Sequence, residues 1–209
     1  MANAKYEFVP GDEKVIAFGR TLKRIRALVT LSYFVSPGSL GGYIESESCL
    51  SASGDAWVYG NAHVSGNAQV YGNARVSGNA RVYGDAWVSG NAQVYGDAQV
   101  YGNARVSGDA RVYGDAWVYG NAQVYGRGLI VWFTGVGTEY GTLTVYNTKD
   151  NSIKVTRGCF HGTVDEFLSA SESKHDDDTH LEYRLLIEVA HNRITKARSA
   201  LPVPVEAAK

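Results

Sequence analysis

The sequence predicts an all-β solenoid of triangular coils followed by a small C-terminal α+β domain. The first observation behind this prediction is a repeat. From Ala52 to Gln123 the chain consists of twelve consecutive six-residue units, nearly all of the form V-x-G-[N/D]-A-x, without insertion or deletion. A fixed short period of this kind is typical of a parallel β-helix. The second observation is that the pattern stops after Val124, where strand-like segments and two helix-start signals follow.

Each unit predicts one short strand and one corner. Around Val58, the small residues Ala56 and Val58 alternate with Trp57 and Tyr59, so we expect the first pair to face inward and the second pair outward. Gly60 and the asparagine after it tolerate positive φ and suit a sharp turn. Three units close a coil, and equivalent strands of successive coils lie about 4.8 Å apart. The inward ladders, such as Val58, Val76, Val94 and Val112, then leave no room for a ligand inside the coils.

The V-x-G-N-A-x spacing resembles that of the hexapeptide-repeat left-handed β-helix family, with Val at the aliphatic position and Ala at the small position four residues later. The resemblance implies left-handed coils and side-by-side trimers. This chain departs from the family at the residue after Val, which is Tyr or Ser here and often Gly or a small or acidic residue there.

Two further motifs lie outside the repeat: S-L-G-G-Y-I-E-S-E from Ser39 to Glu47 and G-C-F-H-G-T-V-D-E-F from Gly158 to Phe167. Together with the repeat they are similar to uncharacterised phage and prophage proteins with G-N-A-x-V coils. That similarity implies a phage-associated accessory protein, and it supplies no reaction and no catalytic residues.

Composition excludes several classes of partner. The chain has 20 basic and 21 acidic residues, so its net charge favours neither long nucleic acid nor anionic membranes. The two cysteines, Cys49 and Cys159, are too few for a disulfide framework and suit a reducing compartment. The start of the chain is polar, and no apolar run approaches the roughly 20 residues of a membrane span. We therefore expect a protein of the bacterial cytoplasm.

The four predicted segments have separate roles. We expect an N-terminal cap of strands and turns in residues 1–51, the solenoid in 52–126, the α+β domain in 127–198 and a disordered tail in 199–209. In the cap, Ile25, Ala27, Val29 and Leu31 alternate with other residues and predict a half-buried strand. Such a cap would cover the open sheet edge of a solenoid end. An alternative use of Lys23, Arg24 and Arg26 is an anion-binding patch.

The C-terminal domain is predicted to hold strands and then two helices. The run Leu129–Phe133 indicates a strand buried on both sides, and Thr142–Tyr146 with Ile153–Thr156 indicates a hairpin that turns at residues 149–151. Thr163 with Glu166, and Thr179 with Glu182, each match a capping box. The second helix, about residues 181–197, should pack on the strands through an apolar stripe of Leu181, Leu185, Val189 and Ile194.

Three catalytic or metal hypotheses arise and are disfavoured. The hexapeptide resemblance implies acyltransferases that use a histidine base, but His63 is the only histidine in the coils and no loop interrupts them. Cys159 and His161, with Asp165 nearby, could form a nucleophilic pair, although a small buried cysteine before a helix cap is the favoured interpretation. A metal site from His161, His175, His180 and residues 176–178 matches no compact zinc or calcium spacing. No cofactor and no metal are predicted.

The corner and surface positions carry the remaining signal. Stacked Asn and Asp residues at the corners, such as Asp55, Asn73, Asn91 and Asp109, favour structural hydrogen-bond ladders over calcium binding. Outward Tyr, Trp and Arg residues are of the types enriched at binding hot spots. The alternative is that exposed tyrosines only raise β-propensity and stack between coils. The predicted binding surface comprises Tyr83, Tyr101, Tyr119, Trp117, Arg81, Arg75 and Arg111.

The sequence thus predicts a non-enzymatic phage accessory protein, an oligomeric β-helix scaffold that presents this Tyr/Arg/Trp surface. The expected partners are further copies of the chain in a homotrimer, and a host defence protein or a small anionic ligand such as a nucleotide signal. Aromatic rings can stack on bases while arginine holds phosphate. The alternative function is a hexapeptide-type acyltransferase.

Overall fold

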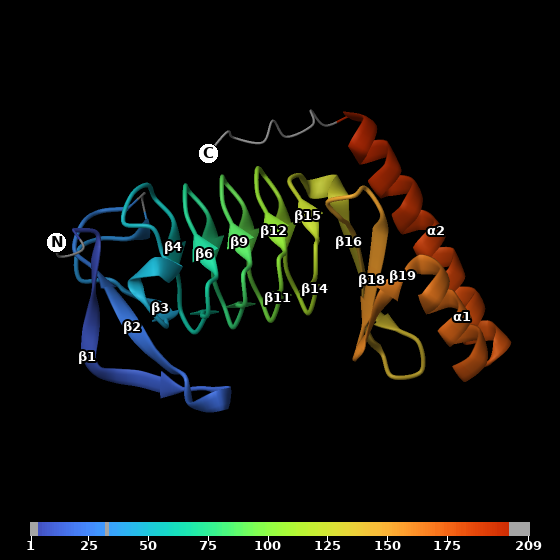
Figure 1. Ribbon diagram of the computed structural model, residues 1–209, viewed down its shortest axis with the longest axis horizontal. Coiled ribbons are helices and arrows are strands. Elements are labelled where there is room, and N and C mark those ends of the chain that lie inside the picture. Colours follow the sequence, from blue (N-terminus) through green and yellow to red (C-terminus); the bar gives the residue numbers. More distant parts are fainter. Residues whose placement is uncertain (1–3, 32–33, 201–209) are drawn as a thin grey trace.

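The computed structural model describes residues 4–31 and 34–200. It shows a parallel β-solenoid of about five turns, followed by a small domain with a sheet and two helices. The N-terminal strands cover one end of the solenoid, and the C-terminal sheet lies between its other end and the two helices (Figure 1). The predicted fold class is confirmed, while the left-handed turn of the coils stays a prediction from the resemblance.

The solenoid is built from twelve strands of two residues, shorter than the four-residue strands that alternation predicted. Each pairs in parallel with the strand one coil away, as Val58 does with Val76 and Val94 with Val112. The strands are β4 (Trp57–Val58), β5 (His63–Val64), β6 (Gln69–Val70), β7 (Arg75–Val76), β8 (Arg81–Val82), β9 (Trp87–Val88), β10 (Gln93–Val94), β11 (Gln99–Val100), β12 (Arg105–Val106), β13 (Arg111–Val112), β14 (Trp117–Val118) and β15 (Gln123–Val124). They form the three faces β4-β7-β10-β13, β5-β8-β11-β14 and β6-β9-β12-β15.

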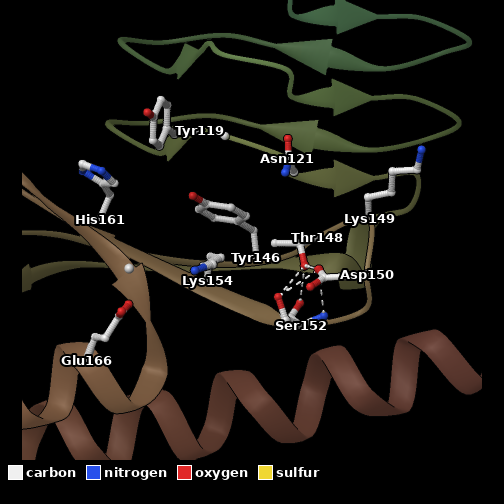
Figure 2. Close-up of a pocket in the computed structure, with 12 residues that line it drawn as sticks. Tyr119, Asn121, Tyr146, Thr148, Lys149, Asp150, Ser152, Lys154, His161 and Glu166 are labelled. Atoms are coloured by element: carbon white, nitrogen blue, oxygen red, sulfur yellow. Dashed lines mark hydrogen bonds between the residues drawn. The ribbon is translucent and has the colours of Figure 1, made fainter.

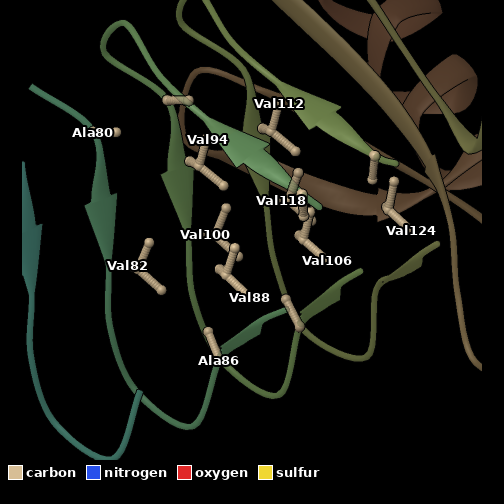
Figure 3. Packing of buried hydrophobic residues seen from close by; sticks show 14 of the residues in the cluster. Ala80, Val82, Ala86, Val88, Val94, Val100, Val106, Val112, Val118 and Val124 are labelled. Carbon is tan, nitrogen blue, oxygen red and sulfur yellow. The ribbon is translucent and has the colours of Figure 1, made fainter. Parts of the chain in front are cut away.

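The interior of the coils is filled by valine and alanine. The valines of all three faces converge along the axis in Figure 3, and each, such as Val94 and Val100, is fully buried. The alanines that precede them by two residues, such as Ala92 and Ala98, are fully buried as well. Each buried valine contributes about 1.5 kcal/mol or more before the entropy cost of ordering. The predicted inward ladders are therefore confirmed.

The corners combine a glycine turn with an amide ladder. Gly84 has a φ of +73°, and a Cβ added there would meet the backbone nitrogen of Gly102 at 3.1 Å. Glycine therefore meets two demands, a left-handed backbone and close stacking of coils. The amide of Asn73 donates to Asn91 at 3.1 Å, and that of Asn91 donates to Asp109 at 3.1 Å. These bonds confirm the structural corner ladder.

The N-terminal cap contains two strands, β1 (Tyr6–Val15) and β3 (Leu40–Ile44), that the sequence pattern did not predict. β1 pairs antiparallel with β2 (Thr21–Ala27), β2 pairs antiparallel with β3, and β3 joins the first coil in parallel with β5. The 3-10 turns η1 (Ala17–Gly19) and η3 (Glu47–Cys49) complete the cap. The predicted strand ends early, at Ala27, and Val29 is 41% exposed because it lies beyond β2.

The cap changes two sequence expectations. Trp57 was expected to face outward, but it is fully buried because Tyr6 of β1 packs against it, edge to face at 6.3 Å between ring centroids. Two of the three residues of the alternative anion patch have acidic neighbours, since Arg26 binds Glu7 at 2.6 Å and Arg24 lies 3.6 Å from Asp12. The third, Lys23, has its ammonium group 5.5 Å from the ring centroid of Phe8.

The C-terminal sheet is an antiparallel meander of β16 (Ile130–Val136), β17 (Gly141–Asn147), β18 (Ile153–Arg157) and β19 (Phe160–Thr163). The 3-10 turn η4 (Arg127–Leu129) leads into it. The predicted hairpin is confirmed as β17 and β18, with Asn151 at a φ of +60° in the turn. The run ending at Phe133 is buried only at its start, since Trp132 and Phe133 are half-exposed at the sheet edge.

Two helices follow, and the capping box of the first is confirmed. In α1 (Val164–Lys174), the Thr163 hydroxyl accepts from the Glu166 amide, and the Glu166 carboxylate accepts from the Thr163 amide. The second predicted box is wrong, because α2 (Asp177–Ala200) begins about four residues before the predicted start at Leu181, and the Asp176 carboxylate accepts from the Thr179 amide at 2.8 Å. Ser199 and Ala200 end α2, and residues 201–209 of the predicted tail lie outside the described residues.

The buried stripe of α2 also differs from the expectation. Leu181, Leu185 and Val189 are 40%, 51% and 43% exposed, so they do not pack on the strands. The packed face consists of Tyr183, Ile187, Ala190 and Ile194, of which only Ile194 was predicted. The helix is therefore rotated about its axis relative to the expectation, and Tyr183 meets Phe167 of α1 edge to face at 5.1 Å between ring centroids. No helix among residues 4–31 and 34–200 is long and apolar enough to cross a membrane.

Side chains of the C-terminal sheet close the end of the solenoid. Thr144 and Thr156, neighbours across β17 and β18, bind one residue of the last coil: the Trp117 amide donates to the Thr144 hydroxyl at 3.2 Å, and the Thr156 hydroxyl donates to the Trp117 carbonyl at 2.9 Å. Asn147 donates to the Gln123 carbonyl at 3.1 Å. These bonds replace those that a further coil would supply.

Candidate functional site

A column of three tyrosines follows one edge of the solenoid. Tyr83, Tyr101 and Tyr119 each stand directly after a valine of the β8-β11-β14 face, one coil apart. The rings of Tyr83 and Tyr101 stack at 4.8 Å with planes 6° apart, and Tyr101 and Tyr119 lie 4.5 Å apart. We call these three residues the tyrosine column. It exists because the unit length is constant, so the same position recurs above itself in every coil.

The tyrosine column ends in a cleft between the last coil and the C-terminal domain. This junction cleft has a volume of about 740 Å³ and takes its walls from the final corner, the β17–β18 hairpin, β19 and the first turn of α1. Its lining residues are Tyr119, Gly120, Asn121, Tyr146, Thr148, Lys149, Asp150, Ser152, Lys154, His161, Gly162 and Glu166. Figure 2 shows Tyr119 and His161 near one end and Lys149 at the other. The His161 ring meets Tyr119 edge to face at 4.9 Å.

Tyr146 forms the floor of the junction cleft and links its two halves. Its side chain is almost fully buried between the last coil and the hairpin (Figure 2). Burial raises the pKa of its phenol well above the ordinary value, and a hydrogen bond with the Tyr119 backbone partly offsets that shift. Burial likewise raises the pKa of Tyr101 to about 12, with Tyr83 and Tyr119 adding to the effect. Tyr101 is therefore uncharged at neutral pH.

The acidic side chains of the cleft are held by local hydrogen bonds. Asp150 accepts from the hydroxyls of Thr148 and Ser152, and these bonds lower the pKa of its carboxyl group. Glu166 accepts from the Thr163 amide at 2.7 Å within the capping box, which lowers its pKa in the same way. Both carboxylates are thus ionised and fixed, and they face a rim that also carries Lys149 and Lys154. The cleft combines aromatic surface with balanced charge.

The structure divides the predicted binding residues between two faces. Arg81 and Trp117 lie on the β8-β11-β14 face, in line with each other through Gln99 and beside the tyrosine column. Arg75 and Arg111 lie on the neighbouring β7-β10-β13 face. There, the Arg75 guanidinium sits 5.8 Å from the ring centroid of Phe34. The seven residues of the predicted binding surface therefore form two separate surfaces, one beside the tyrosine column and one on the β7-β10-β13 face.

The candidate catalytic histidine lies far from the junction cleft. His63 is on β5 in the first coil, half-buried and edge to face with Tyr43 of the cap at 5.8 Å between ring centroids. Burial lowers its pKa, and the nearby cations Lys14 and Arg81 lower it further. Among the described residues its Nε2 atom has no hydrogen-bond partner. His63 thus has an uncharged ring covered by the cap.

The structure does not bring together the residues of the predicted cysteine site or of the predicted metal site. Cys159 is exposed on the β18–β19 turn, so the expected buried cysteine is wrong; the turn carries it away from the sheet. It opens onto a different cleft, lined also by His175, whereas His161 contacts Tyr119. Within the part of the chain that the structure describes, no three His, Cys, Asp or Glu side chains are grouped so as to hold a metal ion.

Sequence reasoning found the column but missed the cleft at its end. Tyr119 was predicted as a binding residue, and His161 was considered only as a partner of Cys159 or as a metal ligand. Tyr146, Lys149 and Lys154 were not singled out, although the predicted hairpin contained all three. What places them beside Tyr119 is the docking of the sheet onto the last coil, which no local pattern specifies.

The coils are similar to one known repeat. A sequence-family model described as YdcK Beta solenoid repeat matches residues 68–84, 74–90, 80–96, 98–111 and 110–126. All of these matches lie within the solenoid, so they support the fold of this part and carry no activity. No curated protein matches the chain in sequence. The resemblances to the hexapeptide family and to phage proteins stay predictions.

Proposed function

We propose that this protein is a non-enzymatic binding scaffold that uses the tyrosine column and the junction cleft to hold a partner. The observation that supports it is the continuity of the two: stacked rings along three coils end at His161 and the cleft. Tyrosine gives a large contact area together with a polar group. The partner in this proposal is a host protein, because a long aromatic edge with a charge-balanced cleft suits a protein surface.

The biological setting of the proposal comes from the sequence. The motifs G-G-Y-I-E-S-E and G-C-F-H-G-T, which resemble those of phage proteins, favour an accessory protein that sequesters a host defence protein in the bacterial cytoplasm. Capture of a nucleotide signal is the small-ligand form of the same function. The scaffold is proposed to act as a homotrimer, because the left-handed β-helices that its repeat resembles commonly associate side by side as trimers.

The test is partner capture with a matched pair of variants. Tagged wild-type protein, a Tyr119→Ala/His161→Ala double variant and a Tyr71→Ala control are expressed in the host bacterium, and each complex is weighed by native mass spectrometry. Tyr71 belongs to another corner of the coils. We expect wild type and control to retain the same partner and the double variant to lose it. Equal recovery by all three proteins would refute the choice of surface.

The acyltransferase alternative has its own test. Purified protein is assayed for transfer of an acyl group from coenzyme A to small amine and hydroxyl acceptors, with His63→Ala as the comparison. We expect no transfer by either protein, because the cap covers His63. Transfer that His63→Ala abolishes would overturn the non-enzymatic proposal.

A further inference from the structure

A second aromatic column runs along another edge of the solenoid and also ends at the C-terminal domain. Tyr95 and Tyr113 stack at 4.8 Å with planes 9° apart, and Trp132 of β16 meets Tyr113 edge to face at 4.1 Å. At this end lies a separate cleft of about 580 Å³, which we call the basic cleft. Its lining residues are Tyr113, Arg127, Gly128, Ile130, Val131, Trp132, Arg193, Lys196, Ala197 and Ala200.

The basic cleft has three cations and no acidic residue in its lining. Arg127 comes from η4, whereas Arg193 and Lys196 come from one face of α2, three residues apart. No carboxylate of the described residues forms an ion pair with any of the three. The C-terminal end of α2 contributes a partial charge of only about −0.5. The cleft therefore has a strongly positive potential, unlike the junction cleft.

Close packing of η4 against α2 fixes the backbone that carries the three cations around one hollow. A Cβ added to Gly128 would lie 2.5 Å from the Cβ of Ala197, so the Gly128 backbone lies directly against the Ala197 methyl group. Ala197 and Ala200 leave the space that longer side chains would fill. Trp132, half-exposed in the lining of the cleft, offers an aromatic surface. The volume lies within the range of small-molecule sites, about 300–1,000 Å³.

We propose that the basic cleft binds a small phosphate-bearing aromatic ligand of the nucleotide class. Guanidinium groups bind phosphate oxygens through paired hydrogen bonds, and ammonium groups add charge. An indole ring supplies a stacking surface for a base. The site is distinct from the tyrosine column, so it does not depend on the proposed protein partner.

The test is calorimetric titration at low salt with adenosine monophosphate, adenosine and inorganic phosphate. We expect adenosine monophosphate to bind more tightly than phosphate, and adenosine more weakly than both. An Arg193→Gln/Lys196→Gln double variant should weaken nucleotide binding at least about tenfold, because it removes two charged contacts. Trp132→Leu should reduce the advantage of the nucleotide over phosphate.

The matched control is Arg184→Gln, which removes an exposed charge from α2 outside the cleft lining. It should bind as wild type does, and circular dichroism checks that each variant is folded. The proposal is overturned if wild type binds no adenosine monophosphate, if the double variant binds it as tightly as wild type, or if adenosine binds equally well. Loss of the protein partner in the capture experiment would not affect this result.

Discussion

At the scale of single residues, the repeat places every valine and alanine of the coils from Ala56 to Val124 inside, whereas the burial of an outward side chain depends on its neighbours. A fully buried Val94 follows directly from its place in the repeat, as does the positive φ of Gly102. Trp57 occupies the same position in its unit as the half-exposed Trp87, yet it is buried. The difference arises from Tyr6, a residue outside the repeat, which covers Trp57 and not Trp87. Repeat position therefore determines the inward side chains, and neighbours from elsewhere determine the outward ones.

The raised phenol pKa of Tyr101 gives a prediction at this scale. Its ordinary pKa is 10.0 and its value in the fold is about 12, so the folded protein holds this proton more tightly than the unfolded chain does. The resulting stabilisation is complete below about pH 10 and is lost as the pH rises toward about 12. Tyr101→Phe keeps the stacked ring and removes the titration. We therefore expect its free energy of unfolding to fall less steeply with pH than that of wild type.

Chemical denaturation at a series of alkaline pH values measures this slope, and ultraviolet absorbance follows the phenolates directly. Tyr140→Phe is the control, because Tyr140 is 81% exposed. The prediction fails if Tyr101→Phe and Tyr140→Phe change the slope equally.

At the scale of elements, the period of the repeat predicts the coils well. The turn, cap and alternation signals of the flanking segments predict their strands and helices less well. The β17–β18 hairpin and the capping box of α1 were predictable, because turn and cap residues act on the backbone next to them. The start of α2 was misplaced because Asp176 competes with Thr179 for the cap, and a carboxylate at this position is as good an N-cap as a threonine. The buried face of α2 was misplaced for a different reason. Leu185 and Tyr183 are both apolar enough to be buried, and only the packing against β16 and β17 selects Tyr183.

Glycine stacking gives a prediction at the element scale. In Gly102→Ala, the added methyl group meets the Gly120 nitrogen at 3.0 Å in a residue with φ +72°. Gly120→Ala has the same backbone strain, at φ +66°, but no atom within 4 Å of the added carbon. We expect Gly120→Ala to lower the free energy of unfolding by about 1 kcal/mol and Gly102→Ala to lower it by roughly 2 kcal/mol or more. Urea denaturation measures both values, and equal losses would mean that contact between coils adds nothing.

At the scale of the whole molecule, neither cleft was predictable, because each lies where the coils meet the C-terminal domain. The sequence contains the residues of both sites, but they come from segments far apart in the chain: Tyr119 with His161, and Arg127 with Arg193. What brings them together is the docking of β17 and β18 onto the last coil through Thr144, Thr156 and Asn147. These side chains are polar and buried. In the sequence, however, they look like the polar, outward residues of an ordinary alternating strand, so their burial against the last coil could not be predicted.

The docking itself can be tested with isosteric substitutions. Thr144→Val/Thr156→Val keeps the shape of both side chains and leaves the Trp117 amide and carbonyl without partners. We expect the free energy of unfolding to fall by about 2–4 kcal/mol, since each unpaired buried polar group costs about 1–3 kcal/mol. Thr142→Val on β17 is the control. Thermal and urea unfolding measure the change, and a double variant as stable as the control would show that apolar packing alone holds the end.

The constant length of the coil has a consequence for how this architecture can vary. Corner residues recur every 18 positions, so one added or removed coil moves the C-terminal domain along the axis by about 4.8 Å without turning it. One added six-residue unit would instead turn the domain by about a third of a revolution, since three units complete a coil. His161 and Trp132 would then meet different edges. Relatives that keep both aromatic columns should therefore differ in the length of the solenoid by whole coils of 18 residues.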